Sequence, residues 1–167
     1  MTFGSWKKWI INGIVVIAIY FAFSVWHSRE LIPNKKNAPE FQLSNIFGSL
    51  VNLNEFRGER VLLYFFAPWC KICDLNVNNL NWLKKLRGKE VQIIAIALSY
   101  NNLNSIESFV DRNNLEVPVL LGSNEIINSY QIKAFPTIYT LNETGLIVSS
   151  TVGYTSIIGL LIRSFYN

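Results

Sequence analysis

The sequence predicts an α/β domain, a mixed sheet flanked by helices, that follows a single transmembrane helix. Three observations lead to this prediction. Apolar runs of strand length alternate with helical stretches, which is typical of a mainly parallel sheet with helices packed on it. A hairpin pattern stands at each end of that series, and the second one adds antiparallel strands. An apolar run long enough to span a bilayer comes before all of them.

The predicted anchor is residues 9–26, interrupted only by Asn12, Gly13 and Ser24. A helix of this length covers roughly 27 Å, close to the hydrocarbon thickness of a bilayer. Tryptophans flank the run, as they do at membrane interfaces. A cleaved secretory signal is the main alternative, because Ala22-Phe23-Ser24 has a small-x-small shape, and a buried core helix is the other. The bulky residues around that site and the length of the run favour a retained anchor.

Charge and composition divide the rest of the chain. Residues 1–8 form the predicted cytoplasmic tail, 27–37 a polar, proline-containing linker, and 38–167 the domain. The net charge of +4 belongs to residues 1–37, which hold five basic residues and one acidic residue, whereas the domain holds ten of each. A neutral domain offers little to phosphates, so nucleic acid is excluded as a partner. The mean hydropathy of +0.25 excludes a disordered chain.

The elements of the domain follow in order. Short apolar segments at 41–43 and 50–53 predict a hairpin. The runs 61–66 and 91–97 are continuous and rich in β-forming residues, as strands buried on both faces are. Between them, 71–87 has one apolar side and three basic residues in its last turn, which suits the helix dipole. The remaining elements are expected as helix 104–112, strand 117–121, helix 124–130, strands 137–141 and 147–151, and helix 155–165.

The two cysteines of the chain, Cys70 and Cys73, stand between the 61–66 strand and the 71–87 helix. A helix N-terminus exposes unpaired N–H groups and a partial positive charge, which stabilise a thiolate. Lys71 adds a nearby positive charge. We therefore predict that Cys70 is the attacking nucleophile and that Cys73, one turn further and more buried, resolves the mixed disulfide.

Two other interpretations of the cysteine pair are weaker. A structural disulfide across two residues would close a very small loop and stabilise little. A zinc site needs two further ligands, and the single histidine, His27, lies in the predicted linker. We therefore expect no metal and no cofactor beyond a redox-active Cys70–Cys73 disulfide. A proline also opens the 137–141 strand, and Pro136 is an unusual residue at that place in a sheet.

These residues resemble the thioredoxin-like superfamily, and within it the membrane-anchored TlpA/ResA-like (redoxin) thiol-disulfide oxidoreductases. The segments that carry the resemblance are 38–41, 52–58, 66–73, 135–137 and 142–145. The resemblance implies a thioredoxin fold with a helix–strand insertion before Pro136, and a cis peptide bond at Pro136 facing the cysteines. The substrate-binding and supporting residues that it implies are Trp69, Lys71, Ile72, Phe135, Pro136 and Thr137.

Three positions depart from the family pattern. Ile72 stands where many relatives have proline, Asn76 where a glutamate is common, and Tyr64 where thioredoxin has a buried aspartate. Neither usual proton-transfer position therefore holds a carboxylate. Asp74 and Glu143 are the carboxylates left to approach the cysteines.

The resemblance implies reduction of disulfides in exported proteins, apocytochrome c among them, with electrons from a membrane thiol reductant. A periplasmic oxidant or isomerase is the alternative. A peroxidase is disfavoured because Ala67 replaces the expected threonine, and a metal-binding assembly factor because no histidine follows His27. Disulfides persist in oxidising compartments. We therefore expect a bacterial inner-membrane protein whose domain lies in the periplasm or outside.

Overall fold

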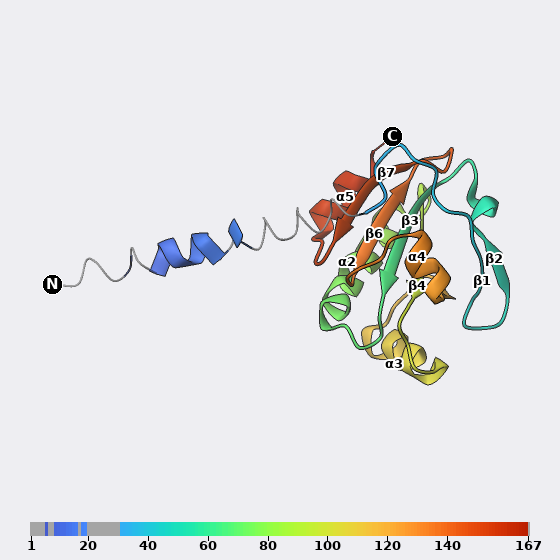
Figure 1. Ribbon diagram of the computed structural model, residues 1–167, viewed down its shortest axis with the longest axis horizontal. Coiled ribbons are helices and arrows are strands. Elements are labelled where there is room, and N and C mark those ends of the chain that lie inside the picture. Colours follow the sequence, from blue (N-terminus) through green and yellow to red (C-terminus); the bar gives the residue numbers. More distant parts are fainter. Residues whose placement is uncertain (1–5, 7–8, 17, 20–30, 167) are drawn as a thin grey trace.

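A five-stranded mixed sheet in the order β5-β4-β3-β6-β7 forms the centre of the domain (Figure 1). The computed structural model describes residues 6, 9–16, 18–19 and 31–166. The strands are β3 (Arg60–Phe66), β4 (Val91–Ala97), β5 (Val119–Leu121), β6 (Thr137–Leu141) and β7 (Ile147–Val152). β5, β4 and β3 run parallel, and β6 and β7 are antiparallel to their neighbours. The predicted mixed α/β sheet is confirmed.

The other elements cover the two faces of this sheet. The helices are α2 (Lys71–Arg87), α3 (Leu103–Asn113), α4 (Asn124–Ser129) and α5 (Ile157–Ser164). The small N-terminal hairpin consists of β1 (Gln42–Ser44) and β2 (Leu50–Asn52), followed by the 3-10 helix η1 (Leu53–Phe56). The first sheet face carries α2, α3 and α5, and the second carries the hairpin and α4. α3 and β5 form the expected helix–strand insertion, with β5 at the sheet edge.

Most element boundaries differ from the sequence prediction by one or two residues, and two of these differences have a clear local cause. The strand predicted at 117–121 begins only at Val119, because Pro118 has no N–H for the ladder. The last helix begins at Ile157, since Ser156 caps it by accepting the Gly159 N–H. The 3-10 helix η1 was not predicted, because four residues carry too little periodicity.

Alternation along β3 divides the core into two clusters. Leu62, Tyr64 and Phe66 pack under α2, α3 and α5, whereas the residues between them pack against the hairpin and α4. All residues of both clusters lie between Leu31 and Leu160. Over the described ranges, the residues of the hydrophobic core therefore all come from 31–160.

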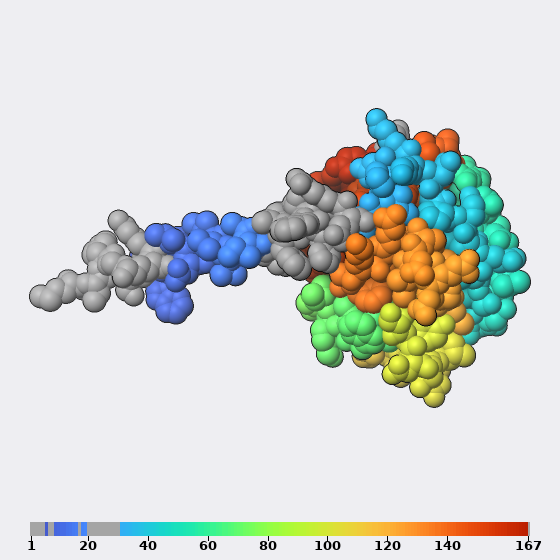
Figure 2. All heavy atoms as spheres, viewed as in Figure 1, coloured from blue at the N-terminus to red at the C-terminus, as the bar shows by residue number. Residues whose placement is uncertain are grey.

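The domain begins earlier than the sequence predicted. Leu31 and Ile32, assigned to the linker, are 4% and 6% exposed, and the Ile32 N–H donates to the Tyr139 hydroxyl at 3.1 Å. Lys35 donates its N–H to the Ile147 carbonyl at 2.7 Å. Residues 31–40 run over the domain surface beside the segment around Tyr130 (Figure 2). Residues 31–37 are therefore part of the domain and not a free linker, because burying two large apolar side chains stabilises this segment on the sheet.

The predicted anchor is only partly described. Residues 9–16 and 18–19 are helical, while 17 and 20–26 lie outside the described residues. Among the residues that the structure describes, none of the helices has both the length and the apolar character needed to cross a bilayer.

Candidate active site

The cysteine pair occupies the first turn of α2, directly after β3. Cys70 is the N-cap residue, and its Sγ accepts the Cys73 N–H at 3.3 Å. Both are free thiols; Cys70 is 7% exposed and Cys73 is 0% exposed. Both cysteines are therefore largely buried, and Cys70 is the more exposed of the two.

Pairing of β3 with β6 brings the proline loop to the cysteines. The two strands are antiparallel with Phe65 opposite Thr137, so the end of β3 and the start of β6 lie at the same edge. The Phe135–Pro136 peptide bond is cis. The rings of Trp69 and Phe135 meet edge to face with centroids 5.8 Å apart. These two segments, far apart in sequence, therefore form one surface beside Cys70.

The predicted supporting residues take different places on this surface. Trp69 is 65% exposed and Ile72 45% exposed, so both present apolar surface to a partner. The Lys71 side chain is 91% exposed. Thr137 is fully buried, and its hydroxyl donates to the Ala134 carbonyl at 2.8 Å, so it holds the proline loop from below.

Of the two carboxylates left open by the sequence, Asp74 lies at the site and Glu143 does not. Asp74 accepts hydrogen bonds from Arg112 at 3.0 Å and Asn113 at 2.9 Å, both on α3. Glu143 pairs with Arg60, at the end of β3 opposite the cysteines. The Asp74 carboxylate is thus engaged in fastening α2 to α3.

Asn76, at the place where relatives commonly have glutamate, is buried and structural. Its Oδ1 accepts the Thr155 N–H at 3.1 Å, and its Nδ2 donates to the Gly153 carbonyl at 3.5 Å. The Gly153 N–H in turn donates to the Pro136 carbonyl at 2.8 Å. A continuous set of hydrogen bonds therefore joins α2 to the proline loop.

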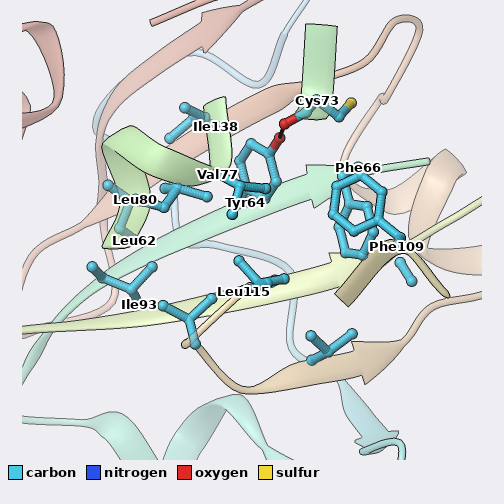
Figure 3. Close-up of a cluster of buried hydrophobic side chains, with 14 of the residues drawn as sticks. Leu62, Tyr64, Phe66, Cys73, Val77, Leu80, Ile93, Phe109, Leu115 and Ile138 are labelled. Atoms are coloured by element: carbon cyan, nitrogen blue, oxygen red, sulfur yellow. Dashed lines mark hydrogen bonds between the residues drawn. The ribbon is translucent and has the colours of Figure 1, made fainter. Parts of the chain in front are cut away.

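Tyr64 lies directly beneath Cys73 (Figure 3). Its hydroxyl donates to the Cys73 carbonyl at 3.1 Å, and the side chain is 0% exposed. Burial raises the pKa of Tyr64 well above its ordinary value. Burial is also the main cause that raises the pKa of the Cys73 thiol, and its hydrogen bond with Cys70 adds to this. Cys73 is therefore a protonated thiol at neutral pH.

This contact was missed by sequence reasoning, which treated Tyr64 only as a missing carboxylate. A usable signal was present, because Tyr64 shares the parity of Leu62 and Phe66 on β3. Side chains of equal parity point to one sheet face, here the face that carries α2.

A depression of about 300 Å³ adjoins Trp69. Its wall is built by the Pro68–Trp69 turn and by α3, through Ser105 and Arg112. Arg112 donates to the Pro68 carbonyl at 2.6 Å, so α3 also holds this turn in place. Over the described ranges, no group of three or more His, Cys, Asp or Glu residues could hold a metal ion.

Comparison with known proteins agrees with this geometry. Residues 35–150 match the model of the AhpC/TSA family. The chain is 26% identical to thioredoxin-like protein YneN of Bacillus subtilis over 88% of this chain and 91% of that protein. It is 28% identical to thiol-disulfide oxidoreductase ResA of Bacillus thuringiensis over 86% of this chain and 83% of that protein.

The fold is shared with solved structures as well. A crystal structure of a putative thiol:disulfide interchange protein DsbE from Chlorobium tepidum superposes with a TM-score of 0.71 at 24% identity. The superposition covers 80% of this chain and 95% of that one. With the family match over most of the domain and a free cysteine pair at the start of α2, the chain belongs to the AhpC/TSA family and is a thioredoxin-like thiol-disulfide oxidoreductase.

Proposed function

We propose that the protein is a membrane-tethered reductase of disulfides in exported proteins. In this proposal residues 1–8 stay in the cytoplasm, 9–26 cross the bacterial inner membrane, and the domain works in the periplasm or outside. The observation that carries the activity is the unequal burial of the two free cysteines, with Cys70 7% exposed at the N-cap of α2 and Cys73 0% exposed. Apocytochrome c cysteines are one substrate class that suits this activity.

The first step is attack by Cys70. The Cys70 thiolate attacks one sulfur of the substrate disulfide, the substrate S–S bond breaks, and one substrate thiolate leaves. The N–H groups at the start of α2 stabilise the negative charge on the attacking sulfur. The exposed surfaces of Trp69 and Ile72 offer apolar contacts to an unfolded chain of varied sequence.

The second step releases the substrate. Cys73 loses its proton and attacks the Cys70 sulfur, so that the Cys70–Cys73 disulfide forms and the second substrate thiolate leaves. Two electrons pass from the dithiol to the substrate. A membrane thiol reductant then returns the Cys70–Cys73 disulfide to the dithiol. Because Cys73 is held as a thiol, this step accelerates as pH rises.

Trapping of substrate intermediates tests the assignment of the two sulfurs. The full chain carrying Cys73→Ser should accumulate mixed disulfides through Cys70, seen as adducts on non-reducing gels that vanish with reductant. The matched variant Cys70→Ser should trap none, since Cys73 is enclosed. Equal trapping by both variants would contradict the proposal.

The direction of electron flow needs its own measurement. A reductase should have a low reduction potential and reduce insulin rapidly. A strongly oxidising potential, or faster refolding of a scrambled substrate than simple reduction, would instead favour the oxidant or isomerase alternative. Protease digestion of spheroplasts tests the location, because residues 38–167 should be cut from outside; full protection would place the domain in the cytoplasm.

A further inference from the structure

Exposed apolar side chains gather on one side of the domain. Thirteen large apolar residues between 31 and 166 are exposed, and nine of them lie on α2, on α5 or within three residues of α5. Seven of these nine form one surface away from Ile72 at the cysteine site and from Tyr166 near the chain end. We call this surface the α2–α5 face, and its members are Leu75, Trp82, Leu86, Tyr154, Ile158, Ile162 and Phe165. The face lies outside the substrate surface around Cys70, and the proposed reaction does not use it.

Contacts between the two helices make these residues one surface. On α2, Leu75, Trp82 and Leu86 follow at spacings of seven and four, which places them on one side of a helix. Asn79, between them, donates to the Tyr154 hydroxyl at 3.2 Å and to the Thr155 carbonyl at 3.1 Å. Figure 1 shows α5 and α2 on the same side of the molecule.

A second contact joins the C-terminal ends of α2 and α5. The Arg87 guanidinium lies over the Phe165 ring, 3.6 Å from its centroid. The exposed apolar residues of α2 and α5 therefore lie on two helices in contact, with the Tyr154 contact at one end and the Phe165 contact at the other.

Charge is segregated onto the same elements. α2 and residues 154–166 carry five basic residues and one acidic residue, Asp74, within a domain that holds ten of each. Asp74 is bound to Arg112 of α3. No other acidic residue occurs on α2 or between 154 and 166. Two of the basic residues have acidic partners outside these segments, since Lys85 pairs with Glu116 and Arg87 with Glu90. The side chains of Lys71 and Lys85 remain 91% and 58% exposed. Exposed apolar side chains with Trp and Tyr among them, flanked by exposed lysines, suit an anionic lipid surface.

The chain also brings this face within reach of a bilayer. Only residues 27–30 separate the predicted anchor from Leu31, which is buried in the domain. Four residues reach at most roughly 14 Å. Just after Leu31, the Lys35 N–H donates to the carbonyl of Ile147, the first residue of β7, and β7 is the strand that precedes α5.

We propose that the α2–α5 face lies against the anionic surface of the membrane that anchors the chain. This inference rests on the proposed function only in that the tether holds the domain at the bilayer. If α2 lies along the membrane surface, Cys70 at its N-terminal end faces parallel to the membrane plane. Partners in or beside the membrane can then approach it. The occupant of the face is a lipid bilayer whose headgroups carry negative charge.

Vesicle sedimentation tests this inference on residues 31–167, which contain the whole hydrophobic core. The fragment should sediment with phosphatidylglycerol vesicles, less with phosphatidylcholine vesicles, and less as salt rises. The pair Trp82→Gln and Ile158→Gln, 58% and 66% exposed in the wild type, should weaken binding roughly tenfold or more. The matched pair Phe47→Gln and Leu50→Gln, 87% and 61% exposed near the N-terminal hairpin, should leave binding unchanged.

Three results would overturn it. These are no sedimentation with either vesicle, equal weakening by both variant pairs, or a lipid-free dimer that the Trp82 and Ile158 pair dissociates. The last result would assign the face to a second copy of the chain. The anchor is tested separately, by retention of the full chain in carbonate-washed membranes. If the full chain is washed off the membranes, the proposed function is wrong. If the full chain stays in the membranes but the fragment does not bind vesicles, only this inference is wrong.

Discussion

At the scale of single residues, the chemistry depends on how Cys73 is enclosed. Tyr64 closes the space beneath it and donates to its carbonyl, so the phenol fixes the first turn of α2 where the resolving sulfur begins. A carboxylate at this place would act as a base, but a buried phenol with a raised pKa stays neutral. Tyr64 is therefore a positioning residue.

Tyr64→Phe keeps the ring and removes only the donor to Cys73. We expect a loss of about 0.5–1.5 kcal/mol in the free energy of unfolding, together with a changed reduction potential and slower release of trapped substrate. Denaturant unfolding and redox titration measure these. Tyr139→Phe, which removes a buried hydroxyl bonded to the Tyr130 carbonyl away from the cysteines, is the control. Equal changes of potential in both variants would refute the positioning role.

The raised pKa of Cys73 also predicts how stability depends on pH. The ordinary thiol value is 9.0, and the folded protein holds this thiol protonated above that pH. The contribution of the Cys73 thiol to the free energy of unfolding is fully present below pH 9. It is lost as pH rises above 9, because the unfolded chain then binds fewer protons than the folded protein. The loss should approach about 1.4 kcal/mol per pH unit.

Urea unfolding of the reduced protein between pH 8 and 11 measures this slope. Reduced Cys73→Ser should show a smaller slope, although the raised pKa of Tyr64 adds loss of the same sign above its ordinary value of 10.0 in both proteins. The oxidised protein has no thiol to ionise and should match the variant. Identical slopes in all three would show that Cys73 ionises as freely as in the unfolded chain.

At the scale of elements, the start of α2 is fastened on two sides. Asp74 joins it to α3 through Arg112, and Asn76 joins it to the β7–α5 connection, which also holds Pro136. The cysteines and the proline loop come from segments that are far apart in sequence. Pairing of β3 with β6 brings them together, and these buried hydrogen bonds add a second connection between α2 and the proline loop.

Asn76→Ala should cost about 1–3 kcal/mol of unfolding free energy, because it leaves the buried Thr155 N–H without its partner. Activity against a protein disulfide should fall further than stability alone explains, as the proline loop loses its link to α2. The exposed Asn78→Ala on the same helix is the control, with an expected change within about 0.5 kcal/mol. Urea unfolding and the rate of insulin reduction measure these effects. An Asn76 variant as active as the Asn78 variant would refute the role of Asn76 in connecting α2 to the proline loop.

At the scale of the whole molecule, the two core clusters enclose the sheet from both faces and include Leu31 and Ile32. Among the residues that the structure describes, the core clusters therefore begin at Leu31. The same arrangement leaves exposed apolar side chains on the outer sides of α2 and α5.

Truncation distinguishes the two candidate starts of the domain. Residues 31–167 should fold and keep a reversible two-electron couple between Cys70 and Cys73. Residues 38–167 should be less stable by several kcal/mol, since burial of each large aliphatic side chain contributes about 1.5–3 kcal/mol. Urea unfolding compares the two fragments. Equal stabilities would show that Leu31 and Ile32 contribute nothing to the fold.

Much of the fold could be predicted from local pattern. The bounds of α2, β4 and β6 agree with the prediction, because a long amphipathic helix and fully buried strands leave strong patterns. The places of the cysteine pair at the start of α2 and of the cis Pro136 before β6 agree with the sequence prediction, since each is a rare residue at a strand boundary. Short elements such as η1, and the shortening of β5 by Pro118, left weaker signals.

The sequence by itself determined the class of fold, the two reacting sulfurs and their order along α2, since these follow from contacts within a few residues. Only the tertiary structure decided that Tyr64 lies beneath Cys73, that Asn76 is bound to the β7–α5 connection, and that Glu143 lies at the far end of β3. Strand pairing and helix packing join residues that are distant in sequence. No periodicity along the chain records which of those residues will meet.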